Sequence, residues 1–191
     1  MRKLRWSLAL LAAAIVIGVP LARAYDRTTR QRNFREVDAG LLYRSGQMTP
    51  AGLERALKEF CIGTVISFRD HRDVGKPSPD EYEDELCRDC GVHYHRLSPL
   101  RWSSTDGTVP AEANVKKFLA LINDPRTPKP ILVHCFAGVH RTGAFVALYR
   151  IERNAWSSAE AVEEMLRIGG TRKVFDEDQI DYLERYESRS R

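Results

Sequence analysis

The 191 residues are enough for one globular domain with its own core, because 43% of them are hydrophobic and 29% are charged. This balance excludes wholesale disorder and a multispan membrane protein. The formal net charge of +4 comes from the basic residues of the first segment, which are Arg2, Lys3, Arg5 and Arg23. The rest of the chain is close to neutral, which argues against a nucleic-acid partner, because such proteins carry an excess of Lys and Arg.

The N-terminal segment has the three parts of a secretory signal peptide. Met1 to Arg5 is basic, an apolar run extends from Trp6 to Ala22, and Ala22-Arg23-Ala24 has the small-residue pattern of a cleavage site. If it is not cleaved, the same run predicts a membrane anchor. Residues 1–24 are therefore assigned to a signal peptide or membrane anchor, and the polar residues 25–33 to a linker. We expect an exported or membrane-anchored protein whose domain is periplasmic or otherwise extracytoplasmic.

Strand and helix patterns alternate through residues 34–191, which we assign to one domain. Strands are predicted at 41–44, 64–68, 92–97 and 131–133. Thr49-Pro50 predicts the N-cap and first residue of a helix that ends near Phe60. Further helices are predicted at 82–90, 113–123, 142–153, 157–169 and 176–187. The alternation predicts an α/β fold with a central, mostly parallel sheet flanked by helices.

The four cysteines are too few for a scaffold built on disulfides in a domain of this size. Cys87 and Cys90 have Cys-x-x-Cys spacing, but a single such pair is a weak indication of a metal site. They form either a local disulfide in an exported domain or two free thiols near a helix end. His93 and His95 alternate on one strand face without a suitably spaced carboxylate, so no metal site is predicted.

One loop combines a nucleophile with an anion site: Val133-His134-Cys135-Phe136-Ala137-Gly138-Val139-His140-Arg141-Thr142-Gly143. It follows a predicted strand and precedes a predicted helix. Backbone N–H groups in such a loop converge on a hollow at the positive end of the helix dipole, which binds anions. The same donors favour a Cys135 thiolate, which is a strong nucleophile. The planar guanidinium of Arg141 can hold two phosphate oxygens at once.

Each position of this loop has an expected role. Gly138 permits the tight turn, His134 orients the loop through backbone contacts, and the Thr142 hydroxyl hydrogen-bonds the thiolate. The residues expected to bind phosphate are those from the position after Cys135 to the arginine, which are Phe136, Ala137, Gly138, Val139, His140 and Arg141.

His134-Cys135, five further residues and Arg141-Thr142-Gly143 resemble the signature of the protein tyrosine and dual-specificity phosphatase superfamily. The late position of this loop favours the dual-specificity type over the low-molecular-weight tyrosine phosphatases. Four other segments are similar to a compact microbial branch of the superfamily, so the resemblance covers most of the chain after Phe34. They are Asn33-Phe34-Arg35, Tyr43-Arg44-Ser45-Gly46-Gln47, Val65 to Arg69 and Pro130 to Val133.

The resemblance implies a dual-specificity-phosphatase-like fold and a phosphomonoester hydrolase that acts through a phosphocysteine, without metal or other cofactor. Its substrate would be a phosphorylated protein or a small phosphoester. The mechanism needs a general acid on a loop before the signature strand, which protonates the leaving oxygen and then activates water. Asp106, in the loop 103–110, is the candidate. As an alternative, Asp106 forms a turn before Gly107.

Two other functions remain open. One is a phosphoinositide or inositol-phosphate phosphatase, but loops for such substrates tend to add lysines and this loop has none, which favours a singly phosphorylated substrate. The other is a catalytically idle, membrane-tethered phosphate-binding module that lacks a working acid. Arg69 to Arg72 follow a strand at the end where α/β proteins bind ligands, and they form either the substrate rim or a solvated turn.

Overall fold

The computed structural model describes residues 16–21, 32–70 and 81–189. Its centre is a five-stranded sheet with the order β1-β2-β5-β3-β4. The strands are β1 (Arg35–Asp38), β2 (Leu42–Ser45), β3 (Thr64–Ser67), β4 (His93–Arg96) and β5 (Ile131–His134). β1 pairs antiparallel with β2, and the other neighbours are parallel. The predicted α/β fold with a mostly parallel sheet is therefore confirmed.

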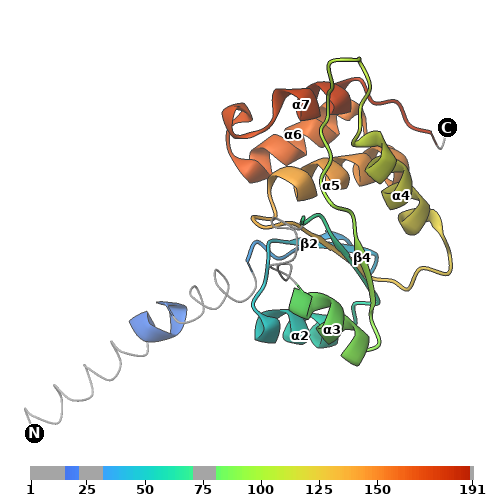
Figure 1. The fold of residues 1–191 in the computed structure, drawn as a ribbon. Helices are drawn as coiled ribbons and strands as arrows, with labels where there is room; N and C mark the ends of the chain where they lie inside the picture. Colours follow the sequence, from blue (N-terminus) through green and yellow to red (C-terminus); the bar gives the residue numbers. More distant parts are fainter. Residues whose placement is uncertain (1–15, 22–31, 71–80, 190–191) are drawn as a thin grey trace, which may run out of the picture.

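Helices cover both faces of the sheet (Figure 1). One face carries α2 (Pro50–Glu59) and α3 (Glu81–Asp89). The other carries α4 (Glu112–Asn123), α5 (His140–Arg153), α6 (Ser158–Gly169) and α7 (Glu177–Glu184). Two predicted helix starts are confirmed, because Thr49 caps α2 and Ser157 forms a capping box with Glu160 at α6.

The two faces of the sheet bury separate apolar clusters. Successive residues of a strand point to opposite faces, so the continuous apolar run of β5 serves both. Ile131 and Val133 face the larger cluster under α4 to α7, whereas Leu132 faces the smaller cluster over α2 and α3. Phe68, which follows β3, and Phe145 of α5 stack with ring centroids 4.1 Å apart in the larger cluster.

β1 was not predicted as a strand. Its sequence Arg35-Glu36-Val37-Asp38 is polar and its residues are exposed or half-buried, as an antiparallel edge strand allows. Residues 32 and 33, which were assigned to the linker, contact the domain, since the Arg32 carbonyl accepts a 2.7 Å hydrogen bond from Gly46 N. Arg32 and Asn33 therefore contact the domain that is predicted to begin at residue 34.

Two expectations from the sequence bear on membranes and disulfides. Across 16–21, 32–70 and 81–189, no helix is both long and apolar enough to span a membrane. Most of the predicted signal peptide or anchor lies outside these residues, so it stays a prediction.

Cys87 and Cys90 are free thiols, as are Cys61 and Cys135. Burial raises the pKa of the Cys87 thiol to about 12.

Candidate active site

Parallel pairing brings the ends of three strands to one edge of the sheet. Ser45 of β2 and Ser67 of β3 both lie level with His134 of β5. The residues that follow these three positions are Gly46, Phe68 and Cys135, so they meet at the same edge. This is the carboxyl edge, where open α/β sheets bind their ligands.

Cys135 opens the short loop between β5 and α5, and its side chain is buried. Gly138 N donates a hydrogen bond to Cys135 Sγ at 3.3 Å. Gly138 has φ +71°, and a Cβ added there would lie 2.4 Å from Gly46 N, so both the conformation and the space require glycine. The predicted role of Gly138 in the turn therefore has a second basis, which is its close contact with the end of β2.

Three successive carbonyls of this loop bind groups outside it. Phe136 O accepts from Gln47 N at 2.9 Å. Ala137 O accepts from Asn33 Nδ2 at 2.8 Å, and Gly138 O accepts from Arg44 Nη2 at 2.9 Å. The C=O and N–H of a trans peptide point in opposite directions. The next three N–H groups, from residues 137 to 139, are therefore turned toward the sulfur side.

The Cys135 thiolate is stabilised by hydrogen bonds. Burial is the largest single influence and raises the pKa of Cys135. The Thr142 hydroxyl and the N–H groups of Thr142, Gly138 and Val139 lower it, and together they outweigh burial, so the pKa lies below its ordinary value.

Arg141 lies in the first turn of α5, which begins at His140 and not at Thr142 as predicted. Its Nη1 donates to Phe68 O at 3.3 Å, which directs the guanidinium toward the end of β3 beside the loop. The His140 ring packs edge-on against Phe175 at 5.2 Å. His140 therefore contributes its backbone to the loop, whereas its side chain lies against a neighbouring segment.

A buried acid and histidine support the loop from the other face of the sheet. His134 Nε2 lies 3.1 Å from Glu83 Oε2, and both side chains are almost fully buried. Glu83 Oε1 also accepts from Gln47 Nε2 at 2.6 Å, and Gln47 Oε1 accepts from Arg69 Nη1 at 3.0 Å. The expected backbone contact of His134 is present, because Phe68 N donates to His134 O at 2.8 Å. Sequence reasoning missed Glu83, which nothing in its own helix distinguishes.

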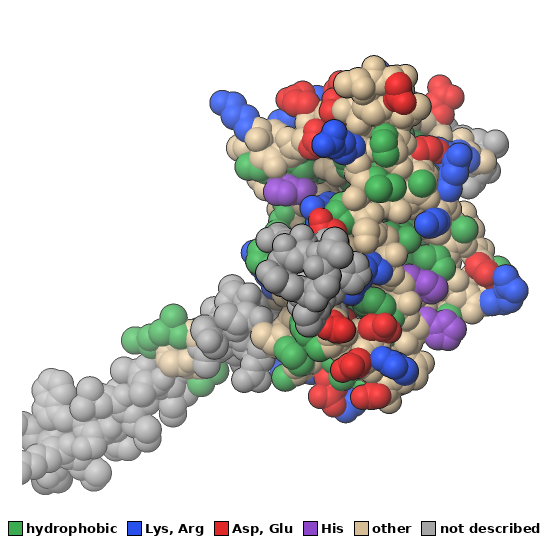
Figure 2. Space-filling view, viewed as in Figure 1, with side chains coloured by type: hydrophobic (Ala, Val, Ile, Leu, Met, Phe, Trp, Pro, Cys, Tyr) green, Lys and Arg blue, Asp and Glu red, His purple; other side chains and the backbone are tan. Residues whose placement is uncertain are grey.

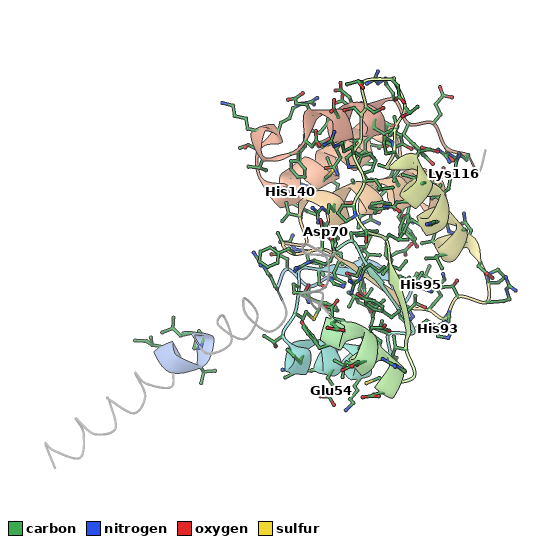
Figure 3. All side chains as sticks on the ribbon, viewed as in Figure 1. Glu54, Asp70, His93, His95, Lys116 and His140 are labelled. Carbon is green, nitrogen blue, oxygen red and sulfur yellow. The ribbon has the colours of Figure 1, made fainter. Side chains whose placement is uncertain are left out.

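The rim of the site is aromatic and positively charged. The Phe136 ring is 51% exposed and lies between two guanidinium groups, those of Arg32 at 4.6 Å and Arg69 at 5.1 Å from the ring centroid. Arg69 is buried, so it belongs to the rim and not to a solvated turn. Asp70, labelled in Figure 3, follows Arg69 and is half-buried. Residues 71 and 72 of the same predicted segment lie outside the described part.

Asp106 is held within its own turn. Its Oδ1 accepts hydrogen bonds from Ser104 Oγ, from Thr108 N at 3.0 Å and from Thr108 Oγ1 at 2.8 Å. These bonds lower the pKa of Asp106 to about 2, so the exposed carboxylate is ionised at neutral pH. The loop that carries it rises beside α7 (Figure 1), where Ser103 Oγ donates to Asp178. This conformation matches the turn-forming alternative and does not bring Asp106 to Cys135.

The described residues hold no group of three or more His, Cys, Asp and Glu side chains that could bind a metal ion. His93 and His95 lie on β4 at the edge of the sheet (Figure 3). Acidic and basic side chains are intermixed over the visible surface in Figure 2, without a broad basic patch.

Comparison with known proteins gives similarities over most of the chain. The family model described as "DSP-PTPase phosphatase fused to NAD+ Kinase" matches residues 19–181. The dual specificity protein phosphatase TpbA of Pseudomonas aeruginosa (strain UCBPP-PA14) is 40% identical over 177 residues, which cover 87% of this chain and 72% of that protein.

Solved structures share the fold. The core catalytic domain of the PP-IP phosphatase SIW14 from S. cerevisiae, in complex with citrate, has a TM-score of 0.62 and 19% identity, covering 83% of this chain and 87% of that one. A P. aeruginosa TpbA variant in complex with pTyr has a TM-score of 0.56 and 23% identity, covering 79% of this chain and 93% of that one. At these identities the structures support the fold and not a substrate.

The hydroxyl of Thr142 should account for part of the thiolate's stability. We expect Thr142→Val to raise the pKa of Cys135 by about one unit, because a hydrogen bond to a charged group contributes ~1.5–3 kcal/mol. The measurement is the pH midpoint of iodoacetamide alkylation at Cys135, followed by mass spectrometry of its peptide. In the parent protein this midpoint should lie below ~8.5, the ordinary value for cysteine.

Thr64→Val is the matched control. Thr64 is equally buried, but its hydroxyl donates to Pro128 O at 2.8 Å, away from the sulfur. Its loss should leave the alkylation midpoint unchanged. Equal midpoints in the parent and in Thr142→Val would contradict the assigned role of the hydroxyl.

Proposed function

The chain belongs to the DSP-PTPase phosphatase family and is a dual-specificity-type protein tyrosine phosphatase, and we propose that it acts through a phosphocysteine formed at Cys135. One observation carries this assignment of the nucleophile. The buried Cys135 sulfur has a lowered pKa and accepts a hydrogen bond from the loop whose N–H groups are turned toward it. Such a site both activates a thiolate and binds a phosphate.

The proposed reaction has two displacements at phosphorus. The Cys135 thiolate attacks, the bond from phosphorus to the leaving oxygen breaks, and a general acid protonates that oxygen. Water then attacks the phosphocysteine, its proton goes to the same carboxylate, and inorganic phosphate leaves with the thiolate restored. Arg141 and the loop N–H groups stabilise the phosphoryl oxygens in both steps, because their charge is already oriented toward them. No metal or other cofactor takes part in this scheme.

Asp106 is proposed as the general acid, and this role requires a different loop position. In the described conformation the carboxylate is ionised by its bonds to Ser104 and Thr108. An acid must carry a proton when the ester bond breaks. The β4–α4 loop would therefore have to release these bonds and leave α7, and burial against the bound substrate would then raise the pKa of Asp106.

We propose a singly phosphorylated protein as the substrate, with phosphotyrosine as the preferred residue. The exposed Phe136 ring at the mouth offers a surface on which the aromatic ring of a phosphotyrosine can stack. The related TpbA has been crystallised with pTyr. The loop carries no lysine that would favour a substrate with several phosphates, so the phosphoinositide and inositol-phosphate alternatives have less support.

Hydrolysis of p-nitrophenyl phosphate in the presence of EDTA tests the activity and its independence of metal. The parent should turn over, Cys135→Ser should not, and Arg141→Lys should be slower by roughly 10²–10³, because lysine cannot bind two phosphate oxygens in one plane. Arg126→Lys is the control, since Arg126 is exposed and paired with Asp124. A parent without turnover under these conditions would favour the idle phosphate-binding module.

The role of Asp106 is tested by the leaving group. With phenyl phosphate, Asp106→Asn should reduce kcat by roughly 10²–10⁴, and the fall of kcat at high pH, which reports loss of the acid's proton, should disappear. With p-nitrophenyl phosphate the loss should be smaller, because that leaving group needs less protonation. Asp124→Asn serves as the control. If Asp106→Asn keeps the full rate on phenyl phosphate, the acid lies elsewhere, and Asp70→Asn becomes the variant expected to lose activity.

We also propose that residues 1–24 direct export or anchor the protein at a membrane. The basis is the sequence pattern of this segment, which ends in Ala22-Arg23-Ala24. Sequencing the N-terminus of the protein recovered from cell fractions tests it. A mature chain that starts at Tyr25 indicates cleavage, an intact chain in the membrane fraction indicates an anchor, and an intact chain in the soluble cytoplasm would refute both.

A further inference from the structure

A second guanidinium is buried directly beneath the phosphate loop. Arg44 lies on β2 and is 2% exposed, which makes it one of the largest fully buried side chains among the described residues. β2 runs parallel to β5, and Arg44 lies level with Val133. The side chain therefore starts beside the strand that leads into Cys135.

The Arg44 guanidinium makes fewer hydrogen bonds than it can. Nη2 donates to Gly138 O at 2.9 Å. Nε and Nη1 are buried without a hydrogen-bond partner among the described residues. A buried cation with two nitrogens that lack acceptors is costly, because desolvation is not repaid by hydrogen bonds. A hydrogen bond to one carbonyl would not by itself require a charged group at this position.

The space around the Arg44 guanidinium is closed on the side of α5. A Cβ added at Gly143, in the first turn of α5, would lie 3.7 Å from Arg44 Nη2 and 2.9 Å from Met165 Cγ. The guanidinium is thus enclosed between β2, the loop and the start of α5. A charge held in such a site is weakly screened, so it acts on neighbouring groups more strongly than a surface charge does.

Two negative groups attract the Arg44 guanidinium, and they are the Glu164 carboxylate and the Cys135 sulfur. Burial lowers the pKa of Arg44 to about 10, Glu164 and Cys135 raise it, and Arg35 and Arg150 lower it, so it stays a cation at neutral pH. Glu164 is already paired, because both of its oxygens accept hydrogen bonds from Arg150 at 2.9 and 3.1 Å.

Other charged groups lie around the loop on different elements. Arg141 faces the site from α5, and Arg69 faces the rim from the end of β3. The His134–Glu83 pair lies on the opposite face of the sheet. Arg44 differs from Arg141 and Arg69 in its acceptor, because Arg44 donates to the Gly138 carbonyl of the loop, whereas Arg141 donates to Phe68 O and Arg69 to Gln47 Oε1.

We propose that Arg44 is a positioning residue whose buried positive charge stabilises the Cys135 thiolate from beneath the loop, held there by its hydrogen bond to the Gly138 carbonyl. This inference deepens the proposed function, since it concerns the same nucleophile. It can be tested without turnover, because the ionisation of Cys135 is measured on the free protein.

Three substitutions separate charge from hydrogen bonding. Arg44→Lys keeps the positive charge, Arg44→Gln keeps a donor without the charge, and Arg44→Met keeps neither. The pH midpoint of iodoacetamide alkylation is measured on the Cys135 peptide by mass spectrometry, since exposed Cys61 also reacts. Circular dichroism and thermal unfolding establish that each variant is folded. If Arg44→Met does not fold, the comparison of Lys with Gln decides the question.

Arg44→Gln and Arg44→Met should raise the midpoint by about one pH unit, which slows alkylation about tenfold at pH values below both midpoints. Arg44→Lys should stay within about twofold of the parent, because the charge remains. The control is Arg35→Gln on β1, where an exposed arginine lies level with Arg44, and its midpoint should not move. Unchanged alkylation midpoints in Arg44→Gln and Arg44→Met would overturn the proposal. A midpoint in Arg44→Lys that shifts as far as in Arg44→Gln would overturn it as well.

Hydrolysis of p-nitrophenyl phosphate, measured on the same variants, keeps the two proposals apart. Arg44 is supported as the positioning residue if kcat/KM is lower in Arg44→Gln than in Arg44→Lys and the alkylation midpoint is higher in Arg44→Gln. A parent that is alkylated at a low midpoint but does not hydrolyse the ester would refute the proposed catalytic function and leave the inference about Arg44 intact.

Discussion

The close contact between the end of β2 and the β5–α5 loop is the constraint on which the site depends. Gly46 and Gly138 approach so closely that neither tolerates a Cβ. Backbone and side-chain donors from residues 33 to 47 hold the three carbonyls of the loop on its outer side. A loop with its carbonyls fixed outward presents its N–H groups to an anion without further reorganisation, which is the condition for electrostatic catalysis.

Charge is arranged in layers around the sulfur. Below the loop lies the buried Arg44, at its helix side lies Arg141, and at its rim Arg32 and Arg69 flank Phe136. A thiolate at the positive end of a helix dipole therefore lies in a surplus of positive charge, which suits a dianionic phosphoryl group. The His134–Glu83 pair and the Arg150–Glu164 pair add no net charge when both partners are ionised, so they order the structure around the site.

The local parts of this site could be predicted from the sequence, and the long-range parts could not. The strand–loop–helix pattern around Cys135 predicts where Cys135, Gly138 and Arg141 lie between β5 and α5, because their backbone geometry is set within a few residues. The roles of Arg44 and Glu83 depend on which strands and helices lie side by side, and a single sequence does not contain that information. Gln47 belongs to a segment that carries the family resemblance, but its hydrogen bonds to Glu83 and Arg69 can be seen only in the folded structure.

Asp106 shows that a residue whose local conformation follows from its neighbours can still have a role that the sequence does not determine. Its neighbours Ser104 and Thr108 are residues that form local turns, and the described conformation follows that local preference. A catalytic role would require the carboxylate to exchange these local bonds for contacts with a substrate. Sequence alone predicts a carboxylate on a suitable loop, whereas the state in which it acts depends on what the loop packs against.

The separation along the chain between the loop and its supports has a consequence for synthesis. Arg44 and Gly138 lie 94 positions apart, and Asn33 and Ala137 lie 104 apart. Contacts of such high sequence separation form only after a long segment of chain has closed, which slows their appearance during folding. On a ribosome, the N-terminal supports emerge long before the loop they shape. The anion site at Cys135 therefore forms only after the chain has been made as far as the start of α5, so a shorter chain lacks it.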